Sequence, residues 1–297
     1  MKYYPKTTKQ IEVRLAGGAG FCYGVKRALE IASTVLQRHP GPVYTLGPLI
    51  HHRQVIDELE KAGIKTCYHP EEIQQGCLII RSHGLHPGLV QQMKEKGLEI
   101  ADATCPYVRR VQRLAQQLYE EGYPIVLVGE SNHPEVIGIR GYAGEKLMVL
   151  SGPEEVGKLP KVHRLGVIAQ TTQTLENFQQ VINRLIFRVK ELRVFNTICT
   201  YTIRRQKETA NLARKVELML VVGGKNSSNT KKLAEISRQA GVLTYHIETA
   251  NEIQSDWLVG KGKIGITGGA STPAESLFLV IERLRTINSR RVKLYGR

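Results

Sequence analysis

Three cysteines, Cys22, Cys105 and Cys199, occupy the same position in a recurring strand-then-helix pattern. Each follows an apolar run, in LAGGAGFC, LEIADATC and LRVFNTIC, and each precedes a stretch with helical periodicity. They lie 83 and 94 residues apart along the chain, which is far too long for a local metal knuckle. The spacing instead predicts one thiol per lobe of a repeated structure, in which a threefold arrangement brings the three thiols together.

The repeat extends beyond the cysteines. After each cysteine helix the chain shows a second strand and helix, then a short strand, then a last strand with a polar turn and a helix. The Val/Ile/Leu-rich runs do not alternate with polar residues, which is typical of parallel strands covered on both faces. We therefore predict an α/β fold of three pseudo-repeated lobes with mainly parallel sheets. The predicted lobes are residues 1–104, 105–198, and 199–297 with a C-terminal tail.

The charge balance is strongly basic, with 42 Lys and Arg against 27 Asp and Glu, a net charge of +15. Clustered cations favour nucleic acid. However, the basic residues are scattered, aromatic residues make up only 6%, and there is a single Trp, so a base-stacking surface is not indicated. A phosphorylated small substrate or an acidic protein partner suits the charge equally well. A basic RNA- or nucleotide-binding protein with zinc on its thiols remains the alternative hypothesis.

The apolar runs and the cysteine count indicate the cellular compartment that we expect for this protein. No apolar run reaches about 18 residues and no signal-peptide pattern is seen, so we expect a cytoplasmic protein without a membrane span. Five cysteines in such a chain disfavour a disulfide framework and favour metal binding or catalysis. Cys67 and Cys77 lack the strand-end setting, and we interpret them as buried structural thiols.

Polar residues follow the ends of several predicted strands, where parallel sheets gather their ligands. Histidines stand there as possible phosphate donors or proton carriers, and hydroxyl and amide side chains at predicted helix starts suit an anion. Glu135 follows one of the histidines by two residues, and neighbouring negative charge makes it a candidate acid. The candidate residues are His51, His83, His133, Glu135, Thr171, Ser227, Ser228, Asn229 and Ser271.

The number and spacing of the three cysteines limit which cofactor they can hold. Structural zinc takes four ligands and usually a close pair of cysteines, and neither condition is met. An iron–sulfur cubane held by only three cysteines keeps one iron open to a substrate atom. Neither a Walker motif nor G-x-G-x-x-G is present, so dinucleotide binding is unsupported.

Eight ordered segments resemble the 4-hydroxy-3-methylbut-2-enyl diphosphate reductase (IspH or LytB) family over almost the whole chain. The segments are GFCYGVKRA, GPLIH, DATCP, SNHPEV, AQTT, NTIC, KNSSNT and GITGGASTP. The resemblance implies three α/β lobes around a central [4Fe–4S] cluster. It also implies the last step of the non-mevalonate isoprenoid pathway, in which an allylic hydroxyl is removed with two electrons and two protons to give isopentenyl and dimethylallyl diphosphate.

The same resemblance assigns roles to individual residues. It makes Cys22, Cys105 and Cys199 the cluster ligands, and it makes Glu135, Thr171 and His133 the catalytic group. The substrate-binding residues it implies are His51, His83, His133, Thr171, Ser227, Ser228, Asn229 and Ser271, with Thr171 orienting the hydroxyl. Electrons are expected from a reduced ferredoxin or flavodoxin, since the chain carries no nucleotide or flavin motif. Gly269, where the family usually has Ala, and Tyr201, where it has a small residue, depart from the pattern.

Overall fold

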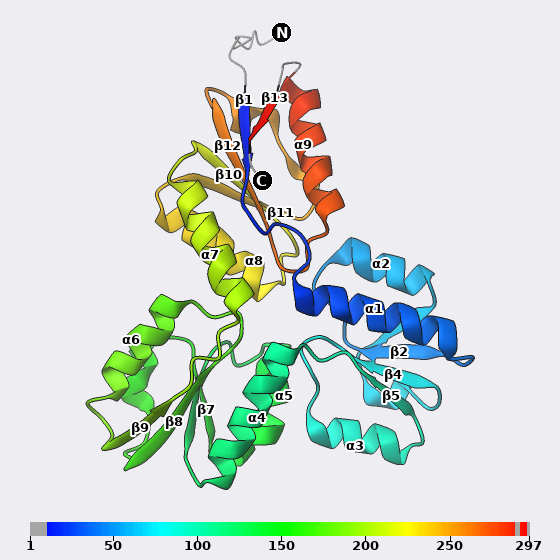
Figure 1. Cartoon of the computed structure of the whole chain (residues 1–297), viewed down its shortest axis with the longest axis vertical. Helices are drawn as coiled ribbons and strands as arrows, with labels where there is room; N and C mark the ends of the chain where they lie inside the picture. Colours follow the sequence, from blue (N-terminus) through cyan, green and yellow to red (C-terminus); the bar gives the residue numbers. More distant parts are fainter. Residues whose placement is uncertain (1–10, 289–291, 296–297) are drawn as a thin grey trace. The chain divides into compact units, whose positions relative to one another are not determined.

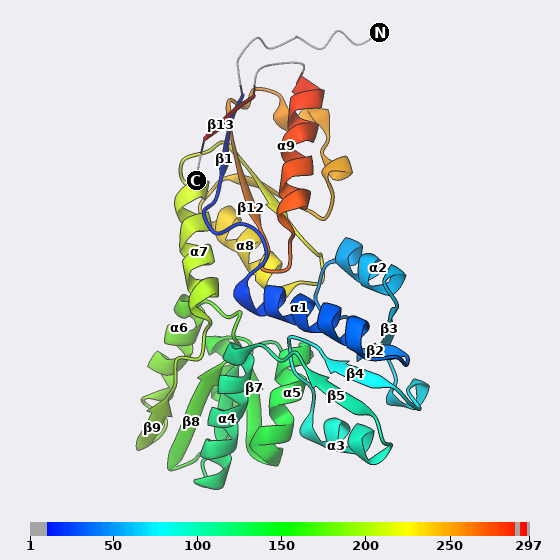
Figure 2. The same ribbon diagram turned by 45° about the vertical axis from the view of Figure 1, so that its right-hand side comes forward.

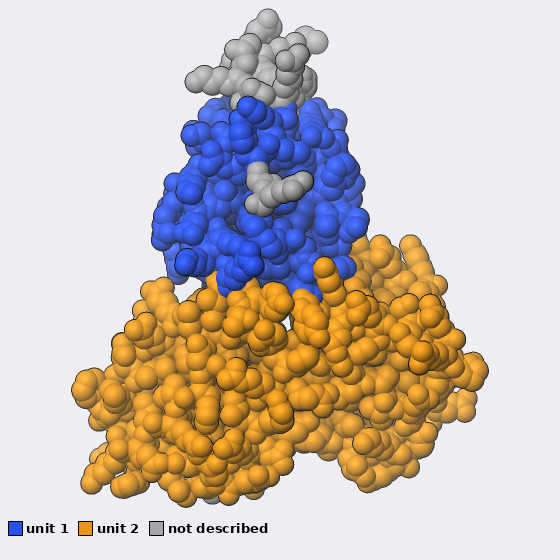
Figure 3. Space-filling model, viewed as in Figure 1, with its two compact units in different colours: residues 1–22, 204–297 blue, residues 23–203 orange. Residues whose placement is uncertain are grey.

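The computed structural model describes residues 11–288 and 292–295. The chain divides into two compact units (Figure 3). Unit 1 contains residues 1–22 and 204–297, and unit 2 contains residues 23–203. Each unit is built on parallel sheets with helices on both faces, which is the predicted α/β class.

The first half of unit 2 holds sheet B, with strand order β3-β2-β4-β5 and every pair parallel. Buried residues of β3 and β4 pack with Met93 of α3 on one face, and α1 and α2 lie against β5 and β3. The strands are β2 (Val43–Leu46), β3 (Ile64–Cys67), β4 (Cys77–Ile80) and β5 (Glu99–Asp102). The helices are α1 (Tyr23–Arg38), α2 (Arg53–Lys61) and α3 (Pro87–Glu95), with a 3₁₀ turn at Pro70–Glu72.

The second half of unit 2 holds sheet C, with strand order β7-β6-β8-β9, again all parallel. Figures 1 and 2 show α6 on one face and α4 and α5 on the other. Alternate residues of β6 explain this: Ile125 and Leu127 pack with α4 and α5, whereas Val126 and Val128 pack with α6. The elements are β6 (Ile125–Val128), β7 (Leu147–Leu150), β8 (Arg164–Ala169), β9 (Glu191–Val194), α4 (Pro106–Glu120), α5 (Pro134–Ala143) and α6 (Leu175–Leu185). Two 3₁₀ segments span Gly144–Lys146 and Pro153–Lys158.

Unit 1 holds sheet A, with strand order β11-β10-β12-β1-β13 and all pairs parallel. Helix α9 covers one face, and α7 and α8 cover the other, so that successive residues of β10 are buried on opposite sides. The strands are β1 (Ile11–Leu15), β10 (Leu218–Val222), β11 (Leu243–Ile247), β12 (Lys263–Gly268) and β13 (Val292–Tyr295). The helices are α7 (Thr200–Ala213), α8 (Ser228–Gln239) and α9 (Ala274–Asn288), with 3₁₀ segments at Ala250–Glu252 and Ser255–Leu258.

The three sheets share one topology, which confirms the repeat. In each, the first strand of a lobe lies between the second and third, and a fourth strand pairs with the third. The fourth strands are β5, β9 and β1, each of which precedes a cysteine. Strand β1 therefore lies in the sheet of the C-terminal lobe and not with residues 16–104, where the prediction placed it, because its partner β12 presents a free parallel edge. The boundaries at residues 104 and 198 stay a prediction.

Candidate functional site

The backbone of each of the three strand-end cysteines is held by the same kind of hydrogen bond. Its backbone N–H donates, over 3.0 Å, to a carbonyl in the polar loop that follows the third strand of the sheet. The pairs are Cys105 to Ser82, Cys199 to Thr171, and Cys22 to Ala270. Each acceptor is itself a predicted site residue or the residue directly before one. The fold therefore links every candidate thiol to a candidate substrate loop at the carboxyl ends of the strands.

The exposure of the five thiols divides them into two groups. Cys22, Cys105 and Cys199 are partly exposed, and each stands directly before a helix, where the helix dipole favours negative charge. Cys67 and Cys77 are free and fully buried. Burial raises the pKa of the Cys77 thiol to about 11 and also raises that of Cys67. The structure confirms that these two thiols are buried, and their structural role stays an interpretation.

Within unit 2, the starts of α4 and α7 lie side by side. The Tyr107 hydroxyl and Thr200 Oγ1 are 2.9 Å apart, and the rings of Tyr107 and Tyr201 meet edge to face at 6.0 Å. Both helices begin next to a candidate cysteine, Cys105 and Cys199. Cys22 belongs to unit 1. In residues 11–288 and 292–295, no three His, Cys, Asp or Glu side chains are arranged as a metal site, and convergence of the three thiols stays a prediction.

Three histidines predicted to act together lie together in unit 2. Their ring centroids are separated by 4.5 Å for His51 and His83, 5.6 Å for His83 and His133, and 6.0 Å for His51 and His133. His51 and His83 follow β2 and β4 of sheet B, whereas His133 caps α5 above sheet C. The carboxyl ends of both sheets therefore contribute to one cluster of imidazoles.

The protonation of the cluster follows from its surroundings. Burial, then the charges of His51, His133 and Arg81, hold the pKa of His83 well below its ordinary value, so this ring is neutral at pH 7. Its Nδ1 atom is buried and has no partner among the described residues. His133 Nδ1 accepts the N–H of Glu135 at 3.1 Å, so the ring's N–H donor is Nε2. Such rings can donate hydrogen bonds to an anion.

Glu135 is the buried acid of the site, with 1% of its surface exposed. Thr171 clamps both of its oxygens: the backbone N–H donates to Oε1 at 2.7 Å and the hydroxyl donates to Oε2 at 2.6 Å. Burial raises the pKa of the Glu135 carboxyl to about 7, although the Thr171 hydrogen bonds oppose the shift. The main cause of the raised pKa is thus burial, whereas the sequence suggested that neighbouring negative charge would raise it. A carboxyl with this pKa can give and take a proton near neutral pH.

This shift predicts a pH-dependent stability. The folded-state pKa of Glu135, about 7, lies above the ordinary 4.5, so the folded protein holds this proton more tightly than the unfolded chain. The stabilisation is complete below about pH 4.5 and is lost as the pH rises through about 7. Relative to Glu135→Gln, the free energy of unfolding of the wild type should fall by about 3 kcal/mol over that window. Urea unfolding of both proteins across the window measures this, and parallel stability curves would contradict it.

The predicted unit 1 residues surround the carboxyl ends of β10 and β12. Ser227 caps α8, its Oγ accepting the Thr230 N–H at 3.3 Å, and Ser228 and Asn229 are buried in the first turn. Asn229 is 4% exposed, and neither atom of its amide has a partner among the described residues. An unsatisfied buried amide is costly, which favours a polar ligand at this position. Ser271 is partly exposed in the loop between β12 and α9.

Gly269 has a steric reason for departing from the family pattern. A Cβ atom at this position would lie 2.1 Å from Thr230 Oγ1, well inside contact distance. Its backbone N–H donates to the Val222 carbonyl at 2.9 Å, which joins the ends of β10 and β12. The glycine therefore allows the α8 start and the Ser271 loop to approach closely.

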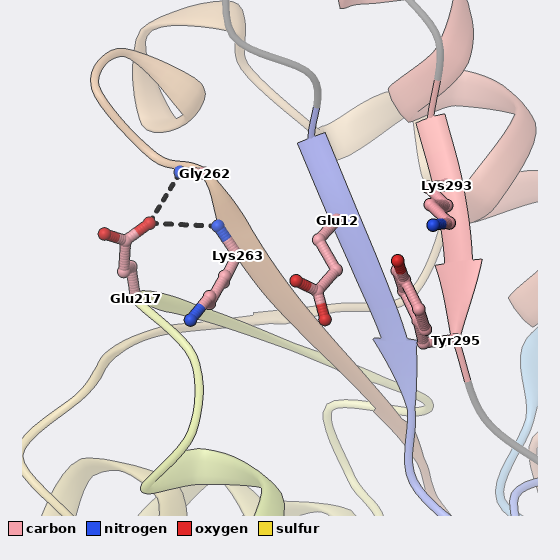
Figure 4. A pocket seen from close by; sticks show the side chains of 6 residues that line it. All are labelled: Glu12, Glu217, Gly262, Lys263, Lys293 and Tyr295. Atoms are coloured by element: carbon pink, nitrogen blue, oxygen red, sulfur yellow. Dashed lines mark hydrogen bonds between the residues drawn. The ribbon is translucent and has the colours of Figure 1, made fainter.

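A separate pocket lies in unit 1 away from these residues (Figure 4). It is lined by Glu12, Glu217, Gly262, Lys263, Lys293 and Tyr295. Glu217 accepts the backbone N–H groups of Gly262 and Lys263, at 2.5 and 2.9 Å, so its carboxylate closes the turn before β12. The pocket lies near the first residues of β1, β10 and β12. Ligands of parallel sheets gather at the opposite ends of the strands, and we leave this pocket out of the candidate site.

Sequence reasoning missed one buried cation of the site, Arg205. It lies on α7, 6% exposed, and donates to the carbonyls of Gly20, Gly268 and Gly269. A signal was present, because Arg205 shares the buried stripe of α7 with Thr202, Thr209 and Leu212. A cation on the buried face of a helix indicates a specific set of acceptors.

The fold and site define a class: a parallel α/β protein whose thiol, imidazole and hydroxyl side chains follow the strand ends and which contains a buried acid with a near-neutral pKa. The model of the LytB protein family matches residues 13–285. Among curated proteins, the 4-hydroxy-3-methylbut-2-enyl diphosphate reductase of Geobacter metallireducens is 45% identical over 94% of this chain and 99% of its own. That of Aquifex aeolicus is 44% identical over 93% and 97%. The chain belongs to the LytB family.

Two solved structures agree with this assignment. A structure of (E)-4-hydroxy-3-methyl-but-2-enyl diphosphate reductase, described as the terminal enzyme of the non-mevalonate pathway, is 44% identical with a TM-score of 0.68, covering 93% of this chain and 100% of that one. The E-1-hydroxy-2-methyl-but-2-enyl-4-diphosphate reductase from Plasmodium falciparum is 29% identical with a TM-score of 0.90, covering 97% and 91%.

Proposed function

We propose that this chain is a 4-hydroxy-3-methylbut-2-enyl diphosphate reductase of the non-mevalonate isoprenoid pathway. Membership of the LytB family and the activity of its relatives support the reaction. The observation in this chain that carries the proposal is the Glu135–Thr171 pair, a buried carboxyl with a pKa of about 7. Reductive removal of a hydroxyl as water requires two protons, and this group can donate a proton at neutral pH.

The diphosphate is assigned to the histidine cluster and to the polar residues of unit 1. His83 has a free buried Nδ1, and His133 presents Nε2–H. The unsatisfied amide of Asn229 supplies a further donor. His51, Ser227, Ser228 and Ser271 complete the proposed contacts. Holding the charged tail positions the reacting carbon, so that binding energy supports the chemical step.

Cys22, Cys105 and Cys199 fit a [4Fe–4S] cluster held by three thiolates. They are partly exposed, stand before helix starts, and have backbones fixed by hydrogen bonds to the substrate loops. When bound, such a cluster supplies electrons singly and a Lewis-acidic iron with an open position. The three thiolates would supply the three sulfur ligands. The backbone of each cysteine is hydrogen-bonded to a proposed substrate loop, as is needed if an open iron of the cluster is to meet the substrate.

The protein's own side chains contribute to the removal of the hydroxyl by supplying protons and by orienting the leaving group. The Thr171 hydroxyl donates to Glu135 Oε2, so a residue of the loop after β8 is hydrogen-bonded directly to the acid. In this proposal Glu135 supplies the proton that leaves with the hydroxyl as water, and Thr171 orients that hydroxyl. His133, whose ring is fixed by the Glu135 N–H, stands beside them as a proton carrier. Exclusion of water around Glu135 maintains its raised pKa.

The electrons require a partner. A reduced ferredoxin or flavodoxin, both typically acidic, suits the net charge of +15 and is the proposed donor in the cytoplasm. The described part of the chain contains no helix of the length and hydropathy needed to span a bilayer.

The proposal is tested on protein purified without oxygen. We expect broad absorption near 400 nm, with iron and sulfide in the sample, and reduction of the allylic diphosphate by a chemical electron donor. A colourless protein with stoichiometric zinc and no turnover would overturn it and favour the nucleotide-binding alternative.

A further inference from the structure

In two of the three sheets, the residue two positions before the candidate cysteine donates a hydrogen bond to the last carbonyl of the third strand. In sheet B, the Ala103 N–H donates to the Ile80 carbonyl at 3.0 Å. In sheet C, the Thr197 hydroxyl donates to the Ala169 carbonyl at 2.6 Å. In both sheets this direct contact fixes the segment that leads into the cysteine.

In sheet A, no backbone hydrogen bond joins the corresponding described residues, Gly20 and Gly268. Six residues separate the end of β1 from Cys22, whereas two separate the end of β5 from Cys105. The longer segment turns at Gly18 and Gly20, whose φ angles of 67° and 110° suit glycine. The Gly20 carbonyl, two residues before Cys22, accepts a hydrogen bond from Arg205 Nη2 at 2.9 Å.

The same guanidinium reaches the end of the third strand. Arg205 Nη1 donates to the Gly268 carbonyl at 2.5 Å and to the Gly269 carbonyl at 3.2 Å. Gly268 ends β12 in the position that Ile80 and Ala169 hold at the ends of β4 and β8. Arg205 therefore bridges in sheet A the two points that touch directly in sheets B and C.

We propose that Arg205 is a positioning residue that sets the Cys22 segment against the loop carrying Ser271. The functional meaning of the two segments rests on the proposed function, in which Cys22 holds the cluster and Ser271 holds the diphosphate. Arg205 then couples cofactor retention to substrate affinity, because its one side chain is hydrogen-bonded to both segments. Its planar fork of donors is required, because a lysine ammonium cannot span both sets of carbonyls.

The experiment compares Arg205→Lys and Arg205→Met with the control Thr209→Val. Thr209 lies one turn further along α7, is fully buried, and its Oγ1 lies 2.9 Å from Thr267 Oγ1 of β12. The control thus removes a buried link between the same helix and the same strand without touching either loop. The first readout is amide hydrogen exchange of Cys22 in the cluster-free protein, because that N–H joins the two loops by its bond to the Ala270 carbonyl.

We expect exchange at the Cys22 amide to accelerate at least about tenfold, relative to the control, in both Arg205 variants. In the loaded enzyme Arg205→Lys should lose iron and raise KM together, while thermal stability falls no further than in Thr209→Val. Full rescue by lysine, or exchange equal to that of the control, would overturn the bridging role. The exchange result stands whether or not the wild type carries a cluster, so failure of the proposed function is recognised separately.

Discussion

Glu135→Gln is expected to keep the cluster and bind the substrate but to lose turnover by about 10²- to 10⁴-fold, the usual contribution of a general acid. The amide has nearly the shape of the carboxyl, and it can still accept the hydrogen bond of the Thr171 N–H on its remaining oxygen. It cannot supply a proton. The measurement is kcat with a chemical reductant, together with the iron content and the dissociation constant for the substrate.

The matched control for this prediction is Glu176→Gln. Glu176 also lies in the first turn of a helix, α6, but it is exposed and contacts only Gln180 among the described residues, at 3.4 Å. We expect its activity to equal that of the wild type. Wild-type kcat in Glu135→Gln would remove Glu135 as the acid. A raised dissociation constant with unchanged kcat would make it a binding residue instead.

For Glu135, the sequence predicts the position of the acid but not the cause of its raised pKa. Its place after His133 at a helix start is readable in SNHPEV, and the structure confirms that start at Pro134. The cause of its raised pKa is not readable, because it comes from burial in the folded protein, which the hydrogen bonds from the distant Thr171 only partly oppose. The pattern located the acid, and tertiary packing sets its pKa.

The repeat was the strongest sequence signal, and it predicted the parallel sheets of three lobes, whereas the shared role of the three histidines was expected from their strand-end positions and the family resemblance. The pairing of β1 was not predicted, because which strand edge receives a segment is decided by long-range contacts that leave no local pattern. The same holds for Arg205, whose acceptors are backbone carbonyls of Gly20 and Gly268. Backbone groups are identical in every residue, so a sequence cannot show which of them a side chain will meet.

Cys105→Ser is expected to have the other large effect, reducing bound cluster to less than about a tenth and turnover with it. A serine hydroxyl is not ionised at neutral pH and is a poor ligand for iron, which iron–sulfur clusters bind through thiolates. The Cys105 backbone should stay in place, because its N–H donates to the Ser82 carbonyl and does not involve the side chain. Loss of iron is therefore expected without loss of fold, as measured by iron and sulfide content, the visible spectrum and the thermal midpoint.

Cys77→Ala provides the contrasting control. Cys77 is fully buried in β4, and its removal should lower stability by about 1 kcal/mol or more through a small cavity. Its iron content should stay at the wild-type value, since the thiol is fully buried within the strand and does not stand at a strand end. An intact cluster in Cys105→Ser would exclude Cys105 as a ligand, and iron loss in Cys77→Ala would show that retention follows stability. The opposite behaviour of the two variants separates a ligand thiol from a packing thiol, because one change leaves the core intact and the other leaves the strand end intact.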